Sequence, residues 1–419
     1  MSALSPKSWL SALKVAQLTR IAFLTGVPST GTKSALIERL DTALRNCSIL
    51  ESAAKRVQAT LKKGAIKGEK LGLDSKNGPK KNGISLLSID MGIRNLAYSH
   101  LIIPAPSDKQ GEHESLAAPI LNAWNRLDVS SLRTNSPTSG LLPTLGSRLS
   151  AELEPGDETL RSVASSDTPL SLEEQESEAA SLPPGPEKES YSPSGYAALA
   201  YTLITSLISM YKPTHVLIER QRFRTGGLAA VPEWTIRVGI FEATLYGVLH
   251  TLKQERCIVD TDLVVEGIDP KRVANYWVEM DPHLLSNPDK PELQQEDRKD
   301  RKQKVKLTKK KLKKSTKETK RAKMDVVARW LEDSLHETNS NYRNLRLSDS
   351  GPVNELVHAY LNKWGNNQTK NTPSAIDIGK LDDLADCLLQ GLTWMAWQDM
   401  RRKIAVQGLP AVTPELENK

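Results

Sequence analysis

Carboxylates stand at three places in the chain where a buried core alone would not put them. Asp90 and Glu219 each follow a short apolar run typical of a buried strand, and three acids crowd the start of a helical pattern near the C-terminus: Asp382, Asp383 and Asp386. Because α/β sheets bind ligands beyond the carboxyl ends of their strands, we expect these side chains to share one crevice. Such a cluster repels itself strongly unless cations lie within it.

This pattern predicts metal-dependent hydrolysis of a phosphodiester. Oxygen ligands favour Mg²⁺ or Mn²⁺ over zinc, and two ions about 4 Å apart would serve the attacking water and the leaving oxygen. We expect Asp90 to bridge both ions and Glu219 to hold one. Asp386 would hold the other with Asp382 or Asp383, since either pair shares a helix face. The candidate catalytic residues are therefore Asp90, Glu219, Asp383 and Asp386, with Asp382 as the alternative ligand.

Each acid also has a structural interpretation. An Asp that ends a strand just ahead of a Gly-containing turn, as Asp90 does before Met91 and Gly92, often closes that turn. Glu219 precedes several arginines and could form a surface ion pair, and acids are favoured in the first turn of a helix by its dipole. The occurrence of all of them in this order along the chain makes the structural interpretation the weaker one.

The apolar periodicity predicts an α/β fold of the RNase H-like kind, a mixed five-stranded sheet flanked by helices in residues 83–405. Three strands form an antiparallel meander, and helices then alternate with two further strands before a long C-terminal helix. The expected strands are Ile84–Asp90, Asn95–Ile103, Ile120–Val129, Thr214–Ile218 and Leu263–Ile268, and the expected helices are Tyr196–Met210, Trp234–Leu252, one from Arg272 to Trp277 and Leu381–Met400.

A small helical module is expected at the N-terminus, in residues 1–50. Two amphipathic helices separated by a Gly- and Pro-containing turn resemble the SAP motif, which binds duplex DNA, and Lys33 is a candidate DNA contact there. A hairpin that only packs against the rest of the protein is the alternative. Residues 51–82 are rich in Lys and Gly, so we expect a basic linker.

Charge is unevenly distributed along the 419 residues, which carry 57 Lys and Arg against 50 Asp and Glu, a net charge of +7. A Ser-, Pro- and Glu-rich insertion at about 130–192 is expected to be disordered and to carry no chemistry. A basic insertion is expected at about 285–323 and a tail at 406–419. The basic stretch could lie along a DNA arm or be a solvated loop or a nuclear-type basic signal.

The three cysteines, Cys47, Cys257 and Cys387, lie far apart and predict neither a zinc site nor a disulfide framework. No apolar run approaches the roughly 20 residues that span a bilayer, so no membrane association is expected. The stretch before Glu38 contains no acidic residue and in this respect resembles a mitochondrial presequence. The alternative is that the same stretch is already part of the folded N-terminal module.

Four segments carry a family resemblance. They are SIDMGIRN (88–95), LIERQRFR (217–224), KLDDLAD (380–386) and DPKRV (269–273), the last leading to Trp277. Together they resemble the motifs of fungal mitochondrial Holliday-junction resolvases, relatives of the bacterial RuvC enzymes. The resemblance implies an RNase H-like fold, Mg²⁺ dependence, a homodimer, paired nicks in four-way junction DNA with mild sequence preference, no small-molecule cofactor, and a place in the mitochondrial matrix with the nucleoid. The two insertions depart from a compact family core.

Basic residues beside the predicted crevice are candidate DNA contacts. Arginines hold phosphates with two hydrogen bonds at once, and an aromatic ring can stack on or wedge between bases. The candidates are Arg220, Arg222, Phe223, Arg224, Lys271 and Arg272. Phe223 could equally belong to the core, and the helix Trp234–Leu252 is a candidate dimer surface or a helix packed on the sheet.

Two other functions fit the same residues. An RNase H-like nuclease acting on RNA–DNA hybrids or other branched DNA would need the same acids. A non-catalytic DNA-binding protein of the SAP type would not, and the presence of every acid argues against it.

Overall fold

The computed structural model describes residues 6–51, 83–104, 116–129, 192–221, 231–255, 262–280, 316–336, 345–365 and 378–417. The predicted acidic insertion lies almost entirely outside these residues. The predicted linker beyond residue 51 and the first part of the basic insertion, up to residue 315, also lie outside them.

A six-stranded mixed sheet forms the centre of the molecule, in the order β5-β4-β1-β2-β3-β6. The first three strands are antiparallel neighbours, whereas β4 and β5 run parallel to β1. The predicted RNase H-like α/β fold is confirmed, and the structure adds one short edge strand, β6. The strands are β1 (Gly83–Asp90), β2 (Leu96–Pro104), β3 (Ile120–Leu127), β4 (His215–Glu219), β5 (Val264–Ile268) and β6 (Arg346–Leu347).

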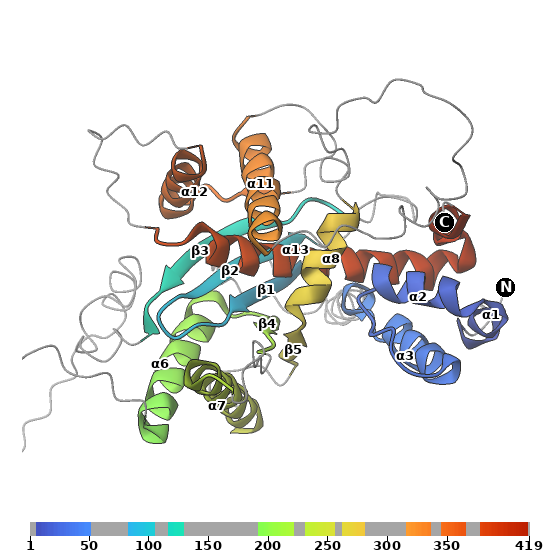
Figure 1. Ribbon diagram of the computed structural model, residues 1–419, viewed down its shortest axis with the longest axis horizontal. Helices are drawn as coiled ribbons and strands as arrows, with labels where there is room; N and C mark the ends of the chain where they lie inside the picture. Colours follow the sequence, from blue (N-terminus) through green and yellow to red (C-terminus); the bar gives the residue numbers. More distant parts are fainter. Residues whose placement is uncertain are drawn as a thin grey trace, which may run out of the picture.

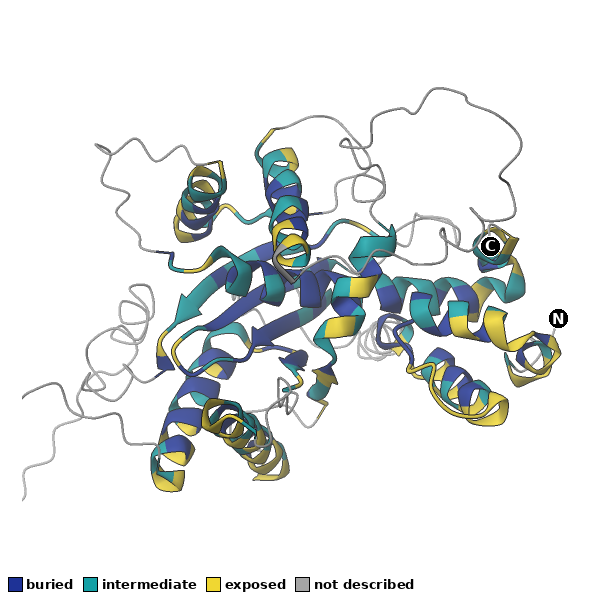
Figure 2. Ribbon diagram, in the orientation of Figure 1, coloured by how far each residue is buried: buried dark blue, intermediate teal, exposed yellow. Residues whose placement is uncertain are grey.

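Helices cover both faces of the sheet (Figures 1 and 2). Successive strand residues point to opposite faces, so Leu87 and Ile89 pack under α6 (Pro193–Tyr211) and α7 (Glu233–Glu255). Leu86 belongs to the core of the other face, which is covered by α8 (Pro270–Met280), α11 (Thr316–Leu335), α12 (Gly351–Trp364) and α13 (Leu381–Gln407). Burial on both faces explains why β1 reads as a nearly continuous apolar run.

Helix α13 is 27 residues long and continues past the sheet to the N-terminal module (Figure 1). Its Ile404 shares a core with Leu18 and Leu40 of that module. Between residues 6 and 45 the module has three helices instead of the two expected: α1 (Pro6–Ala12), α2 (Val15–Leu24) and α3 (Lys33–Arg45). Residues expected as a tail form the end of α13, a 3₁₀ turn η2 (Leu409–Ala411) and a short helix α14 (Thr413–Glu417).

Arg20 links the N-terminal module to the rest of the protein through ion pairs. It pairs with Glu279 of α8 at 2.7 Å and with Glu415 of α14 at 2.5 Å, and its guanidinium lies 5.2 Å from the Phe23 ring. The module is therefore packed against the domain by both an apolar core and ion pairs.

Part of the predicted basic insertion is helical, which corrects its boundary. Residues 316–323 begin α11, because apolar side chains recur at helical spacing inside and just after the lysine run. Among them Ala322, Val326 and Val327 are buried in the core.

Two further sequence predictions concern cysteines and membranes. Cys47 and Cys387 are free and buried, and Cys257 lies outside the described residues. Within the described part of the chain, none of the helices has the length and apolar content to cross a bilayer.

Candidate active site

The structure brings Asp90 and Glu219 side by side. Strands β1 and β4 are parallel neighbours with Ile89 opposite Ile218. The carboxylates of Asp90 and Glu219 therefore lie side by side at the carboxyl ends of these two strands. Asp90 is buried, with 9% of its surface exposed, and Glu219 lies close enough to raise the pKa of its carboxyl group. Gly92 lies in the turn that follows, where a Cβ atom would meet the Asn95 carbonyl oxygen at 2.9 Å.

Hydrogen bonds from the sheet hold the first turns of α13 over this edge. Ser88 donates its hydroxyl to the Cys387 carbonyl at 2.7 Å, and Trp124 donates its indole N–H to the Leu384 carbonyl at 3.0 Å. Gly391 permits the close approach, because a Cβ atom there would lie 2.7 Å from Leu101. The acids of α13 are thereby carried to the strand ends.

The carboxylates influence one another electrostatically. Burial raises the pKa of Asp90 well above its ordinary value, and Glu219, Asp386 and Asp383 raise it further. Burial among protein atoms raises the pKa of Asp386 to about 6, although the ammonium of Lys323 opposes the rise. Several carboxylates are thus held so close together that the negative charge of each disfavours ionisation of the others.

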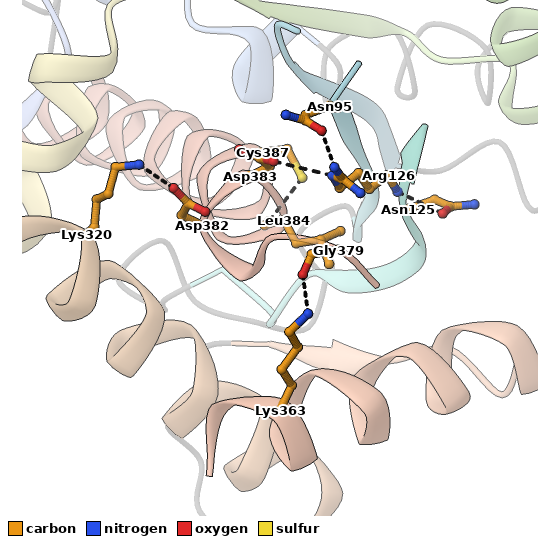
Figure 3. A network of polar contacts seen from close by, with 10 residues as sticks. All are labelled: Asn95, Asn125, Arg126, Lys320, Lys363, Gly379, Asp382, Asp383, Leu384 and Cys387. Atoms are coloured by element: carbon orange, nitrogen blue, oxygen red, sulfur yellow. Dashed lines mark hydrogen bonds and ion pairs between the residues drawn. The ribbon is translucent and has the colours of Figure 1, made fainter. Parts of the chain in front are cut away.

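Asp382 and Asp383 point to different partners (Figure 3). Asp382 pairs with Lys320 of α11 at 2.5 Å. Burial opposes its ionisation, but the ammonium outweighs burial, so the pKa of Asp382 is lowered. Asp383 faces Arg126 of β3 at 3.4 Å, and burial together with Asp382 leaves the pKa of Asp383 raised.

Three basic residues of this region were not singled out from the sequence. Lys323 of α11 donates to both carboxylate oxygens of Asp386, one at 2.7 Å. Lys320 and Arg126 neutralise the two neighbouring acids. The lysines belong to a run that reads as a solvated insertion, and Arg126 lies within an ordinary strand, so neither pattern distinguishes these three residues.

The donor set fits a hard divalent cation in its chemistry. Buried carboxylates with raised pKa values are oxygen donors that gain from a positive ion. Within the described residues, however, no three His, Cys, Asp or Glu side chains are gathered closely enough to hold an ion. Lys320, Lys323 and Arg126 supply the positive charge next to the helix acids.

The candidate DNA contacts lie in different environments. Arg220 lines a pocket beside Glu219, and Lys271 is exposed at the start of α8. Arg272 instead turns inward, 5.0 Å from the Trp397 ring, and burial lowers its pKa. Lys33 donates to the Ser11 carbonyl at 2.9 Å. The other three candidates, Arg222, Phe223 and Arg224, lie outside the described residues.

A pocket of about 330 Å³ opens beside the acids. The turn after β1, the end of β4 and the first turn of α7 form its walls, and both Glu219 and Asp383 line it. Its volume is at the lower end of the range of about 300–1,000 Å³ that is usual for ligand sites.

The fold and this site define an RNase H-like protein with a carboxylate cluster where the central strands end. The family model described as "Mitochondrial resolvase Ydc2 / RNA splicing MRS1" matches residues 86–404, and the chain belongs to this family.

Individual relatives are more distant. The chain is 35% identical over 92 residues to "Cruciform cutting endonuclease 1, mitochondrial" of Schizosaccharomyces pombe, a match that covers 21% of this chain and 34% of the relative, about a third of its length. The crystal structure of the yeast mitochondrial Holliday junction resolvase Ydc2 matches with 18% identity and a TM-score of 0.43, over 94% of this chain and 99% of that one. The Thermus thermophilus RuvC structure matches with 12% identity and a TM-score of 0.22, over 50% of this chain and 86% of that one.

Proposed function

We propose that this protein is a metal-dependent endonuclease that resolves four-way DNA junctions by paired cuts. The observation that carries the proposal is the convergence of Asp90, Glu219 and the first turns of α13 at one edge of an RNase H-like sheet. Membership of a family whose description names a mitochondrial resolvase supports the choice of substrate.

The proposed catalytic residues are Asp90, Glu219, Asp383 and Asp386. Asp383 is preferred over Asp382 because it lines the pocket with Glu219 and raises the pKa of Asp90. Asp382 is instead held by Lys320, and we assign it the role of fixing that lysine near the helix start. Arg220 and Lys271 remain candidate phosphate contacts.

These carboxylates would hold Mg²⁺ or Mn²⁺, and we propose two ions. Bound ions would activate the attacking water and stabilise the leaving oxygen. The chain itself holds these donors in place: the sheet fixes Asp90 and Glu219, and the packing of α13 fixes Asp386.

A homodimer suits the proposal because a four-way junction needs two symmetric cuts. Helix α7 offers a surface for it: Ile236 and Ile240 are 42% and 44% exposed, one turn apart on its outer face. Ile240→Lys would then give a monomer in light-scattering measurements, whereas an unchanged mass would exclude this face.

The names of the family and of its relatives support a mitochondrial location, and DNA binding would place the protein at the matrix nucleoid.

The function is tested by comparing matched substrates in Mg²⁺: a four-way junction, a linear duplex of the same sequence and an RNA–DNA hybrid. Paired nicks confined to the junction are expected. Cleavage of the hybrid or of other branched DNA instead would keep the site and change the substrate. Binding without cleavage of any substrate would support the non-catalytic DNA-binding alternative.

A further inference from the structure

Trp234 lies on the inner face of α7 although 43% of its surface is exposed. Counting 100° per residue, it shares its face with Val238, Phe241 and Leu245, which are all buried against the sheet. Ile236 and Ile240 lie on the opposite face. Trp234 is exposed because it stands in the first turn of the helix, where the inner face meets the pocket instead of the core.

The rest of the pocket lining includes both apolar and polar side chains. Val238 and the buried Ile93 contribute apolar surface, and the amides of Asn95 and Gln221 contribute hydrogen-bonding groups. The backbone N–H of Gln221 donates to Glu242 at 2.9 Å, and its side-chain amide donates to Glu219 at 3.5 Å. Asn95 accepts from Arg126 through its side-chain oxygen, and its amide nitrogen is turned away from that arginine (Figure 3).

The lining carries two acids, Glu219 and Asp383, and two arginines, Arg94 and Arg220, so its formal charges balance and a neutral group suits it. A flat, neutral ring with polar edges fits an aromatic side chain, apolar surface and two amides. Unpaired nucleobases are bound in this way, by stacking on aromatic side chains and hydrogen bonds to their edges.

We infer that the pocket binds an unpaired nucleobase of the DNA next to the phosphate that is cut, with Trp234 stacking on it and Asn95 and Gln221 contacting its edge. The inference rests on the proposed nuclease function and makes these residues determinants of the cut-site sequence. The contacts from Asn95 to Arg126 and from Arg126 to Asp383 connect this base to a catalytic acid.

The test is to map cut sites on a junction whose branch point migrates through many sequences. Trp234→Ala is expected to cut about 10-fold more slowly or worse, the loss expected for one stacked base. Its cuts should spread over more sequences than those of the wild-type protein, and Trp234→Phe should restore the pattern. Gln221→Ala should change the pattern without removing an aromatic ring, which keeps the test valid if Trp234→Ala fails to fold.

The matched control is Tyr201→Ala, which removes an exposed aromatic side chain of α6 that does not line the pocket. It should keep both the rate and the cut-site pattern. An unchanged rate and pattern in both Trp234→Ala and Gln221→Ala would overturn the inference while the nuclease function stands.

A binding measurement separates the two claims. In an Asp90→Asn background, 2-aminopurine placed at each position around the branch point should change its emission at one position beside the cut, and the change should vanish with Trp234→Ala. A position-independent signal, or one indifferent to Trp234, would contradict base binding. Failure of the wild-type protein to cut any junction would instead contradict the proposed function.

Discussion

The side-chain amide of Gln390 donates to the backbone carbonyl of Ile89 at 3.2 Å and to the hydroxyl of Ser88 at 3.0 Å. Gln390 is buried one turn after Asp386 on α13, and Ile89 immediately precedes Asp90. This contact therefore sets the separation between the helix acids and the strand acids. Gln390 is a positioning residue, since it bonds the Ile89 carbonyl and the Ser88 hydroxyl and not the carboxylates of the proposed reaction centre.

Gln390→Leu should slow cleavage at saturating junction by about 10-fold or more, because misplacement of reacting groups by a fraction of an ångström is costly. Junction affinity should stay within about twofold. The unfolding free energy should fall by about 1–3 kcal/mol, since the Ile89 carbonyl loses a buried donor. Single-turnover kinetics and chemical denaturation provide these values.

A matched control exists on the same helix. Gln398 is also buried and accepts a hydrogen bond from the Ser48 backbone N–H at 3.2 Å, beside the N-terminal module. Gln398→Leu should lower stability by a similar amount and leave the rate unchanged. Equal rate losses in both variants would show that Gln390 affects cleavage only through the general stability of the fold and not by positioning the acids.

Asp90→Asn should make the protein more stable in metal-free buffer near neutral pH. Burial and Glu219 raise the pKa of Asp90, so the folded state disfavours its charge, and the sign of the linkage makes ionisation there destabilising. Mg²⁺ at a hundredfold excess over its Kd should raise the unfolding free energy of the wild-type protein by about 2.7 kcal/mol, seen as a higher melting temperature, and that of the variant much less. Equal Mg²⁺ effects on both proteins would exclude Asp90 as a ligand.

Asp382→Asn and Asp383→Asn form a second matched pair. Asp383→Asn should lower the cleavage rate by about 100-fold or more, the scale of removing a group that stabilises the reaction centre. Asp382→Asn should lower it by about 10-fold or less, because Asp382 supports the site through Lys320. The reverse order, measured as single-turnover rates at saturating Mg²⁺, would reassign the ligand.

Lowering the pH should lower the free energy of unfolding through protonation linked to His100. Its ring bonds the Ser85 hydroxyl at 2.7 Å and the Asn122 amide at 2.9 Å, and burial lowers its pKa to about 4. The unfolded chain binds a proton below pH 6.5 and the folded chain does not, so this contribution is present above pH 6.5 and is lost as the pH falls toward 4. The loss is about 2 kcal/mol between pH 7 and 5.

His100→Gln removes this titration and should flatten the pH dependence of denaturation by that amount. The acids with raised pKa values act in the opposite direction, because they favour the folded state as the pH falls. They are common to both proteins and cancel in the comparison. Parallel stability profiles for the two proteins would show that His100 does not carry the effect.

The sequence was sufficient to place the strand acids. Asp90 and Glu219 follow apolar runs that are buried on both faces, and their proximity follows from strand order alone. It was insufficient for the partners of the helix acids. Lys320 and Lys323 stand in a low-complexity run, and their direction depends on how α11 packs on α13, which no local pattern encodes.

Arg272 shows the opposite limit. Its place in the DPKRV segment predicts a phosphate contact, whereas the structure lays it on Trp397, a residue 125 positions later in the chain. The N-terminal module shows a third limit. Leu10, Leu18 and Ile21 are buried as their spacing indicates. The helix expected there is interrupted before Val15, where Gln17 accepts a hydrogen bond from the Lys14 N–H at 2.9 Å.

The measurement that tests the central claim most directly compares the wild-type protein with Asp90→Asn on one four-way junction, recording binding and cleavage in the same Mg²⁺ buffer. The account predicts paired nicks by the wild-type protein, and junction binding of equal affinity without nicks by Asp90→Asn. Nicking by Asp90→Asn at the wild-type rate would show that the hydrolysis is not carried out at the carboxylates where β1, β4 and α13 meet.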